Sequence, residues 1–564
     1  MKNARDSGPG DGTRGAFHGR SGAYRGRVHA TGPGETADTG PAPALAPRAR
    51  HLALSTFVFA LATGLSRVLG LVREIVAAYY FGSVGKINAF TVAYQVPNLI
   101  RALVADAALS SAFVPVFTEL LEKGDRKRAW RVASSVFFLM LLGLGALTAL
   151  CIVFAPLLIR PFGDPGGDEQ LAVTLTRILF PTVVLLGVSG VIVGILNSYD
   201  EFTVPALAPV AWNIAIIVGL VIGVPSASSL DAKLYVYAVS ILVGTVIQVL
   251  LPVPWLRGLD GRLRVALDWR DPAVKQVFVL MLPVTLGLGL INFNAVVDTL
   301  FASRLIDPEQ APRAIDLAFR LYMLPQGIFS VAVATILFPT LARLAARGDM
   351  DGFRRTSAIG LRQIGFLLIP ASAVFASLAT PIVRLVYQHG AFTPDQTAVV
   401  AQCLAAFSLG LAFNGAMLML NRSFFSLQSP WVPTAVALLN LGLNAVFDWA
   451  FYRLGTWGIP LATSVVNIAG TVALMQFLRM RIGRIELTET IHSTARVLVA
   501  SAALAVVAHE VWAALDSLLG RGTGAQIVSL LGAFGAGIAT YLGVCLLLGV
   551  RELNPLHSIG GDDR

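Results

Sequence analysis

The sequence predicts an all-α polytopic membrane protein with about 14 transmembrane helices, arranged as two six-helix lobes in a pseudo-twofold repeat plus two C-terminal helices. Of its 564 residues, 55% are hydrophobic and only 13% are charged, whereas about 25% of the residues in soluble domains are charged. The apolar residues form long uninterrupted runs. Segments of the first half recur in the second at an offset of 224 residues. These three observations together indicate a duplicated helical membrane protein.

The apolar runs are helices by length and by the needs of their backbone. A helix crosses the bilayer core with about 20 apolar residues, and backbone groups in lipid must be satisfied within the segment. The runs are longer than the roughly 10-residue strands of a membrane barrel. In chain order, we predict helices at 52–81, 87–117, 130–158, 171–197, 203–224, 233–256, 271–305, 311–342, 353–383, 396–426, 431–453, 457–481, 490–515 and 523–549.

The first fifty residues differ from the rest. They are rich in Gly, Ala, Pro and Arg and lack the apolar core of a secretory signal peptide, so we predict a disordered basic tail. The predicted organisation is a cytoplasmic tail at 1–50, an N-lobe of helices 1–6 at 51–256, a C-lobe of helices 7–12 at 271–481, helices 13 and 14 at 490–549, and a second cytoplasmic tail at 550–564.

Basic residues alternate from one connection to the next. Clusters occur at 123–128, 257–270, 343–355 and 479–484, whereas the intervening connections carry mostly single Lys or Arg residues. Cytoplasmic loops of membrane proteins carry the excess of Lys and Arg. The pattern therefore predicts that both termini are cytoplasmic.

The internal repeat is carried by helix ends. Pro115 and Gly124 pair with Pro339 and Gly348 at the offset of 224, and Asn197 pairs with Asn421 at the same offset. Two parallel copies of a six-helix unit would place a substrate site between the halves, near the membrane midplane. Chance similarity of Pro and Gly at helix ends is the alternative.

Four arginines fall inside predicted spans: Arg67, Arg73, Arg101 and Arg320. Each would cost about 2.5–3.5 kcal/mol at the centre of a helix in lipid, so we expect them to face a hydrated cavity between the lobes. Guanidinium groups match phosphate oxygens in pairs, and such a cavity suits an anionic substrate. Ion pairs with Glu74 and Asp106 are the structural alternative for part of the set.

A group of oxygen-bearing side chains lies at similar depth on three later helices. It comprises Asp298, Asn444 and Asp448, with Thr463 close by. Oxygen ligands without thiols or imidazoles suit a hard cation, so we expect a sodium site; a hydrogen-bonded packing cluster is the alternative. The three cysteines and seven histidines show no spacing typical of a disulfide framework or a zinc site, and no other cofactor is expected.

Five segments resemble consecutive signatures of the MurJ/MviN family of lipid II flippases. They are "SRVLGLVREIVAAYYFG", "NAFTVAYQVPNLIRALVADAALSSAFVPVF", "ILNSYDEFTVPALAPVAWN", "FRLYMLPQGIFSVAVATILFPTL" and "LVYQHGAFTPDQT", in the family's order over roughly 52–480. The family belongs to the multidrug, oligosaccharidyl-lipid and polysaccharide exporter superfamily. The resemblance implies alternating access that moves undecaprenyl-diphosphate-disaccharide-pentapeptide, called lipid II, from the inner to the outer leaflet.

The resemblance also implies roles for particular residues. The substrate-binding set is Arg67, Arg73, Arg101 and Arg320, to which we add Asn98 and Asp106 beside Arg101; the family's sodium site is matched by Asp298, Asn444, Asp448 and Thr463. Four positions depart from the family pattern, one of them Asp106, where the family has a glutamate. Asn88 and Met323 stand where many members have an acid, and Ala102 stands where many have a second basic residue. These changes leave open a paralogue that carries another polyprenyl-linked glycan.

Other functional classes fit the sequence less well. A glycosyltransferase would need a catalytic acid on the outer connections, which are short and have no acid cluster, so we expect no enzyme activity. A drug or cation antiporter of the same fold would favour an acidic cavity. The expected partners are lipid II and membrane lipids rather than nucleic acid. We expect a monomer in the bacterial cell membrane, in association with the cell-wall synthesis machinery.

Overall fold

The computed structural model describes residues 46–104, 107–483 and 487–553. Asp106, the first 45 residues and most of the predicted C-terminal tail lie outside these ranges. The chain divides into two units, Met1–Leu52 and Ala53–Arg564, and the description below concerns the second. Every regular element in the described residues is helical, which confirms the predicted fold class.

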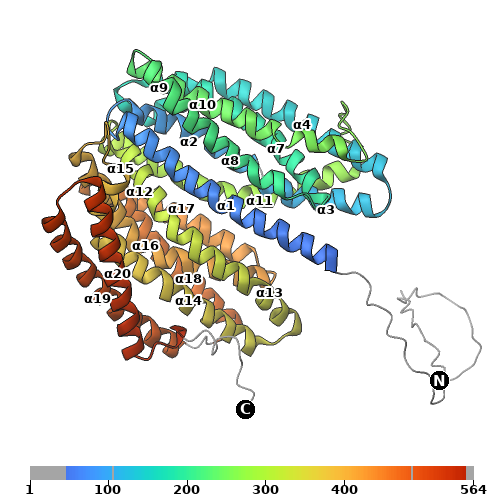
Figure 1. Cartoon of the computed structure of the whole chain (residues 1–564). Helices are drawn as coiled ribbons and strands as arrows, with labels where there is room; N and C mark the ends of the chain where they lie inside the picture. The colour runs from blue at the N-terminus through green and yellow to red at the C-terminus, as the bar shows by residue number, and fades with distance from the viewer. Residues whose placement is uncertain (1–45, 105–106, 484–486, 554–564) are drawn as a thin grey trace, which may run out of the picture. The chain divides into compact units, whose positions relative to one another are not determined.

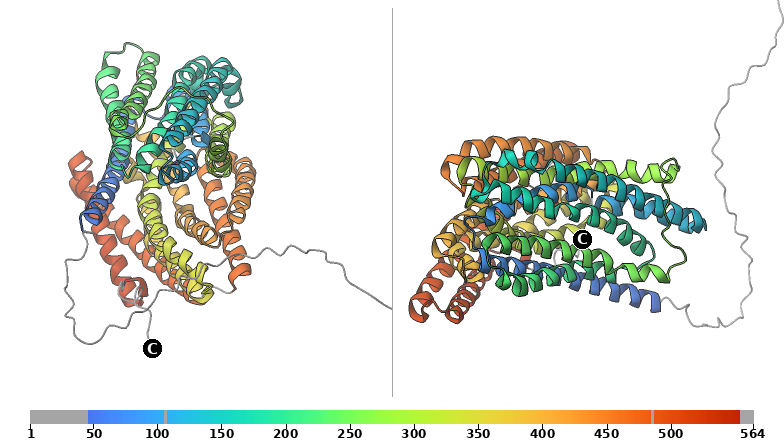
Figure 2. Two further views of the ribbon diagram at one scale, coloured as in Figure 1. Left: turned by 90° about the vertical axis from the view of Figure 1, so that its right-hand side faces the viewer. Right: turned by 90° about the horizontal axis from the view of Figure 1, so that it is seen from above.

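The N-terminal half forms one group of helices and the C-terminal half a second, as Figure 1 and the left view of Figure 2 show. The first group contains α1 (Ala46–Phe81), α2 (Ile87–Val104), α3 (Ala107–Glu122), α4 (Arg126–Val153), α5 (Ala155–Ile159), α6 (Glu169–Leu179), α7 (Pro181–Ser198), α8 (Thr203–Val218), α9 (Val224–Ser226) and α10 (Leu230–Leu250). The second contains α11 (Pro272–Phe301), α12 (Ala311–Pro325), α13 (Val331–Arg347), α14 (Met350–Ser377), α15 (Ala379–Tyr387), α16 (Pro394–Ser426), α17 (Trp431–Phe451) and α18 (Gly458–Ile482). We call these groups the N-lobe and the C-lobe.

Two further helices stand outside both lobes. They are α19 (Leu487–Leu519) and α20 (Thr523–Leu547), which pack against each other, with α19 also lying against α14. Short 3-10 or π-helical turns join or extend the main helices: η1 (Arg160–Phe162), η2 (Pro165–Gly167), η3 (Gly219–Gly223), η4 (Val253–Gly258), η5 (Ala302–Ile306), η6 (Gln326–Ser330), η7 (Tyr452–Leu454) and η8 (Arg551–Leu553).

Eleven helical segments in the described part of the chain are long and apolar enough to cross a membrane. The remaining predicted spans fall on α1, on α2 with α3, and on α11, each of which is described only in part. The protein is therefore a multi-pass membrane protein, and the predicted total of about 14 spans is consistent with this structure. Two predicted boundaries move because of local chemistry: α4 begins at Arg126 rather than 130 since Asp125 caps it, and α13 continues to Arg347.

The repeat is visible in the geometry of one turn. Gly124 and Gly348 end α3 and α13 in the left-handed conformation, with φ of +76° and +71°. Each is followed by an aspartate, Asp125 or Asp349, whose carboxylate accepts a backbone hydrogen bond and begins the next helix. In both copies the amide of that aspartate donates to a leucine carbonyl one turn earlier, over 3.1 and 3.0 Å. A left-handed residue with this bonding terminates helices economically.

The second repeated turn differs from the prediction by one helical turn. Asp200 and Gln428 are the two non-glycine residues in the described ranges with positive φ, at 61° and 52°. They follow α7 and α16 in equivalent turns, so the structural offset here is 228 residues rather than 224. Asn197 consequently matches Phe425, and the predicted pairing with Asn421 is wrong. The reason is that α16 has 33 residues whereas the segment formed by α6 and α7 has 30, about one helical turn fewer.

Helix α11, counted above with the C-lobe, packs against both lobes. Its first turns pack with α3 and α4 in a buried cluster that includes Val274, Val277 and Trp130, whereas its second half packs against α17. The connection before it, 259–271, lies along α4: the amides of Arg264 and Asp268 donate to the hydroxyls of Ser134 and Ser135 over 3.1 and 3.2 Å. We call residues 259–271 the strap.

Candidate substrate and cation sites

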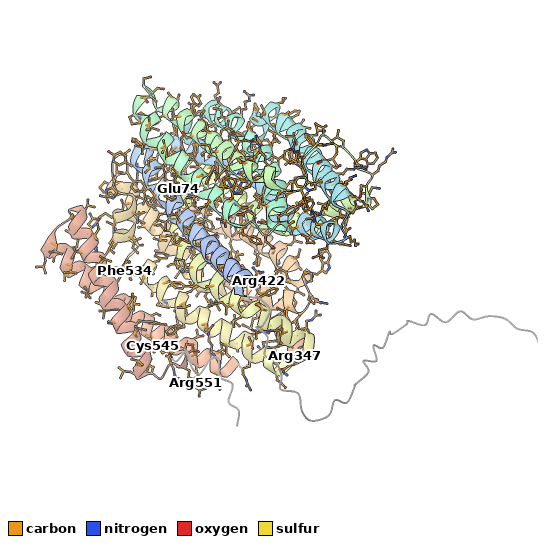
Figure 3. The ribbon with its side chains drawn as sticks, turned by 45° about the vertical axis from the view of Figure 1, so that its right-hand side comes forward. Glu74, Arg347, Arg422, Phe534, Cys545 and Arg551 are labelled. Carbon is orange, nitrogen blue, oxygen red and sulfur yellow. The ribbon has the colours of Figure 1, made fainter. Side chains whose placement is uncertain are left out.

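An ion network joins the two lobes where α1 faces α12. Glu74 of α1 lies at its centre, with Oε2 3.0 Å from Nη2 of Arg313 and Oε1 3.3 Å from Nη1 of Arg320. Arg73, the residue before it, places Nη2 2.7 Å from the same Oε1. Asp316 accepts from both arginines of α12 over 2.8 and 3.0 Å. Figure 3 shows Glu74 on α1, where this helix runs between the lobes.

The network holds more positive than negative charge. Three guanidinium groups, from Arg73, Arg313 and Arg320, face the carboxylates of Glu74 and Asp316, which leaves one net positive charge. Arg73 and Arg313 are almost fully buried, whereas 30% of the Arg320 side chain is exposed. An uncompensated buried cation is costly. The surplus charge therefore favours an anion that approaches Arg320.

Arg73 is the most firmly held of the three arginines. Besides Glu74, its Nη1 donates to Oδ1 of Asn213 over 3.2 Å, and its guanidinium lies over the ring of Trp212 at 4.7 Å from the centroid. Asn213 in turn donates to the carbonyl of Pro209 within α8. These contacts fix Arg73 to the N-lobe, so its position is set by that lobe alone.

The other predicted substrate-binding residues lie apart from the network. Arg67 is exposed and its guanidinium lies against Gly327 in η6, where an added Cβ would meet Nη1 at 1.9 Å. Arg101 donates to Oδ1 of Asn98, one turn earlier on its own helix, over 2.7 and 3.1 Å. Asp106 lies outside the described residues. Thus Arg73 and Arg320 both contact Glu74. Arg67 contacts the C-lobe separately, at Gly327. The side-chain hydrogen bonds of Arg101 described here stay within α2.

Sequence reasoning missed Arg313 and Asp316. Arg313 occupies the first turn of α12 and looks like a residue of a connection, yet only 2% of its side chain is exposed. The available signal was the spacing: Asp316 lies three residues after Arg313 and four before Arg320, and residues at these spacings share a helix face.

We call the end of the bundle that carries the Lys and Arg clusters the basic end. The lobes are also joined at the opposite end. Figure 3 labels Arg347 and Arg551 at the basic end and Glu74 nearer the other, which we call the sealed end. There the amides of Gly85 and Gly166 donate to the carbonyls of Glu309 and Pro308, over 2.7 and 2.8 Å. The Ser83 amide donates to Gln396 over 2.9 Å.

Asn88 bridges the sealed end with both halves of its amide. Its Oδ1 accepts from the Arg313 amide over 2.8 Å, and its Nδ2 donates to the carbonyl of Glu309. A carboxylate at this position could accept the first bond but could not donate the second. The asparagine that departs from the family pattern is therefore suited to hold the sealed end closed.

Asp298, Asn444 and Asp448, which we call the oxygen cluster, form a contact between α11 and α17. Nδ2 of Asn444 donates to Asp298 over 2.5 Å and to Asp448 over 3.0 Å, so one amide nitrogen holds both carboxyl groups. Asn444 and Asp448 are fully buried. Oδ1 of each has no hydrogen-bond partner. Thr463 of α18 lines a cavity that Asp298 and Asn444 also line, and its hydroxyl lies 3.3 Å from the Ile459 carbonyl.

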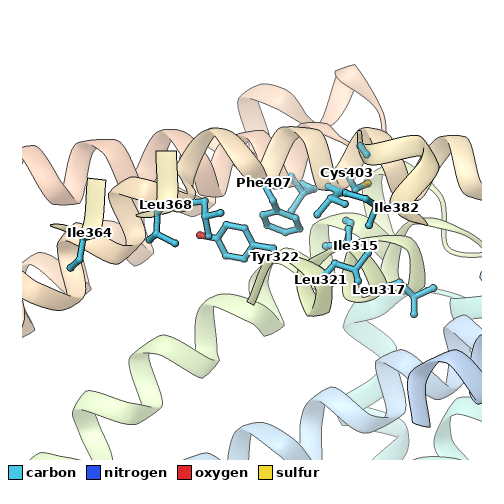
Figure 4. Packing of buried hydrophobic residues seen from close by; sticks show 14 of the residues in the cluster. Ile315, Leu317, Leu321, Tyr322, Ile364, Leu368, Ile382, Cys403 and Phe407 are labelled. Atoms are coloured by element: carbon cyan, nitrogen blue, oxygen red, sulfur yellow. The ribbon is translucent and has the colours of Figure 1, made fainter. Parts of the chain in front are cut away.

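That cavity occupies the C-lobe side of the interface and has a volume of about 260 Å³. Its wall contains Tyr322 and Phe407, whose rings lie 5.3 Å apart and are seen side by side in Figure 4. Gln95 and Asp316 line both this cavity and the small pocket around Arg73 and Arg320. The arginine network and the C-lobe cavity are therefore directly adjacent.

Comparison with known proteins identifies the family. The family model described as lipid II flippase MurJ matches residues 77–523. The chain belongs to the MurJ family. A probable lipid II flippase MurJ from Vibrio cholerae is 30% identical over 518 residues, which cover 89% of this chain and 97% of that protein. A lipid II flippase MurJ from Burkholderia cenocepacia is 30% identical over 428 residues, covering 74% and 82%.

Solved structures agree with this assignment. A lipid II flippase MurJ in an inward closed conformation superposes with a TM-score of 0.72 at 25% identity, covering 88% of this chain and 99% of that one. An inward-facing transporter of the multidrug resistance MATE family superposes with a TM-score of 0.64 at 16% identity, covering 77% and 99%. The second likeness shows a shared fold alone.

Proposed function

We propose that this protein is a lipid II flippase, which moves undecaprenyl-diphosphate-disaccharide-pentapeptide from the inner to the outer leaflet of a bacterial cell membrane by alternating access. Membership of the MurJ family supports this substrate, since its relatives are named lipid II flippases. The observation that carries the proposal is the inter-lobe network of three arginines and two carboxylates.

The network provides a way to bind and release a diphosphate. Arg320 contacts Glu74 and Asp316, and its exposed donors face the pocket. Phosphate oxygens accept paired N–H donors as carboxylate oxygens do. A diphosphate that replaces Glu74 beside Arg320 would loosen the tie between α1 and α12. Binding would then weaken one of the contacts that hold the lobes together, as alternating access requires.

The orientation follows from the basic end. Its Lys and Arg clusters belong on the cytoplasmic side, so both termini are cytoplasmic and the sealed end faces outward. In this arrangement the contacts of Asn88, Gly85 and Gly166 close the outward-facing end of the protein. The sealed end must part before the substrate leaves.

The oxygen cluster fits a sodium ion as the coupling ion. Two carboxyl groups that accept from the same amide nitrogen repel each other when both are ionised, and a bound cation would offset that repulsion. Asn444 and Asp448 each have a buried oxygen with no partner. Asp298, Asn444 and Asp448 would hold the ion, with Thr463 nearby. Bound sodium supplies positive charge that permits both carboxylates to ionise. The three residues themselves tie α11 to α17.

The test is complementation of cells depleted of their own lipid II flippase, with outer-leaflet lipid II measured at matched protein abundance. Wild-type protein should restore lipid II accessibility. Arg320→Lys should lower flipping at least tenfold, equivalent to about 1.4 kcal/mol, because an ammonium does not reproduce the bidentate fork. Arg347→Lys, an exposed site at the basic end, is the matched control and should retain full activity.

Two results would contradict the proposal at different levels. Wild-type protein that reaches the membrane at normal abundance without restoring lipid II accessibility would exclude lipid II and favour another polyprenyl-linked glycan or a drug or cation antiporter. Full activity of Arg320→Lys beside an active wild type would remove the diphosphate role of this arginine while leaving the substrate intact.

A further inference from the structure

The C-lobe cavity has a chemistry unlike that of the arginine network. Seven amide side chains line it, and its charged lining residues among those described are Asp298 and Asp316, without any Lys, Arg or His. A second phosphate or a free carboxylate would meet acids here rather than cations. The wall therefore suits a neutral group that is rich in hydrogen-bonding atoms.

Besides Asn444 of the oxygen cluster, two of these amides have carbonyl oxygens that lack partners. Oδ1 of Asn421 on α16 and Oδ1 of Asn440 on α17 are buried, and neither accepts a hydrogen bond. An unsatisfied buried acceptor costs about 1–3 kcal/mol. A ligand hydroxyl or amide N–H would recover that cost at each position once rotation of the amide turns its Oδ1 toward the cavity.

The sodium cluster does not account for these two oxygens. Asn440 and Asp448 are eight residues apart on α17, a rise of about 12 Å along a helix. Oxygen ligands of a hard cation lie at about 2.3–2.6 Å, so Asn440 cannot share an ion with Asp448. Asn421 belongs to α16, which contributes no member of the cluster.

Aromatic rings complete the cavity. Phe319, Tyr322 and Phe407 lie with neighbouring ring centroids 5.3–5.7 Å apart, and Asn414 and Asn467 hold the Tyr322 hydroxyl through bonds of 2.8 and 3.4 Å. Phe319 remains 38% exposed although it lines the cavity. An apolar ring face beside oriented amides can pack against the C–H face of a sugar while the amides bond its hydroxyls.

We infer that the C-lobe cavity binds the sugar attached to the diphosphate of the substrate, with Asn421 and Asn440 as specificity-determining residues. This inference rests on the proposed function. Gln95 and Asp316 border both the arginine pocket and the cavity, so a diphosphate at Arg320 directs the next chemical group into the amide-lined space. A cavity of about 260 Å³ lies near the lower bound of small-molecule sites, about 300 Å³, and takes one compact group rather than the whole glycopeptide.

The experiment measures binding to the full-length protein in lipid nanodiscs with three probes: undecaprenyl diphosphate, the same lipid bearing the disaccharide without peptide, and complete lipid II. Wild-type protein should bind both glycosylated lipids more tightly than undecaprenyl diphosphate. Asn421→Ala and Asn440→Ala should each weaken binding of the glycosylated lipids about tenfold and leave undecaprenyl diphosphate unchanged. Asn197→Ala, at the end of α7 and outside the cavity, should change none of the three.

The outcomes separate the inference from the function on which it rests. If wild-type protein binds none of the probes, the proposed function fails. If it prefers glycosylated lipid and both alanine variants keep that preference, the amide role is overturned. If the preference requires the peptide, the cavity does not bind a sugar. Thermal unfolding reports whether each variant folds, and Asn421→Ser and Asn440→Ser, which keep a short polar side chain, take the place of any alanine variant that does not.

Discussion

Asn444 and Asp448 are fully buried, and in the proposed function they hold a sodium ion together with Asp298. We expect sodium to raise the melting temperature of the purified protein relative to potassium at equal ionic strength, because a ligand of the folded state stabilises it, by about 2.7 kcal/mol at one hundred times its Kd. Asp448→Asn removes one of the two carboxylates and should abolish the difference between the salts. Asp351→Asn, an exposed acid at the basic end, should preserve it. Equal melting temperatures of the wild type in both salts, with a dependence on pH instead, would favour a proton at this position.

At the scale of residues, the energetic cost of burial made part of the site predictable. Arg73, Arg320, Asp298 and Asp448 stood out because charges inside apolar runs need partners. Arg313 did not stand out, since it is the third residue of α12 and its burial depends on the opposing lobe. Hydropathy locates a residue along its own helix, but the partners of Glu74 come from tertiary packing across the lobe interface.

The strap is the element that fixes the first half of α11 to the N-lobe. Gly261 lies against Trp130, and a Cβ at this position would come within 2.2 Å of the indole ring. The side chain of Asp260 accepts from the same indole. A hydrogen bond from the Tyr199 hydroxyl holds the pKa of Asp260 below its usual value. The stability that the ionised Asp260 contributes is fully present at pH values above the ordinary pKa of an aspartate. It is lost as the pH falls through the lowered pKa of Asp260.

We expect Gly261→Ala to displace Trp130 and loosen the strap. Overpacking a filled site costs about 1–3 kcal/mol, so the variant should unfold at lower temperature and flip lipid II more slowly. Gly258→Ala, in the adjoining turn, meets no atom within 4 Å and should behave as wild type. Unchanged melting temperature and unchanged flipping in Gly261→Ala would show that the strap does not depend on this contact.

The elements themselves were largely predictable, because membrane helices follow from long apolar runs alone. The turn after Gly124 and its copy after Gly348 were found from the repeated Pro and Gly. The turns at Asp200 and Gln428 were paired one helical turn out of register, because non-glycine residues with positive φ leave no reliable signal in sequence. The position of α11 across both lobes could not be predicted either, since it depends on packing between distant helices.

At the scale of the whole molecule, the sealed end should open and close during transport. Ser83 is fully buried beneath the inter-lobe contacts, whereas its neighbour Val84 is 41% exposed. We expect Val84→Cys in intact cells to react with a membrane-impermeant maleimide at all times. Ser83→Cys should react slowly, and faster when the seal is weakened by Asn88→Ala. The three native cysteines are buried and should give little background.

Failure of Val84→Cys to react from outside would contradict the proposed orientation. Equal reactivity of Ser83→Cys with and without the Asn88 substitution would mean that the amide bridge does not control opening.

The ion pairs of Glu74 with Arg73, Arg313 and Arg320 have a consequence for the return of the empty protein in the proposed cycle. After lipid II departs, guanidinium groups without a partner would leave uncompensated positive charge inside the membrane. That charge would slow the conformational change that returns the empty protein to the inward-facing state. Glu74, which pairs with Arg313 and Arg320 in this structure, would compensate part of that positive charge in the empty protein. If Glu74 acts in this way in the proposed cycle, we expect the return of the empty protein to need no second lipid substrate.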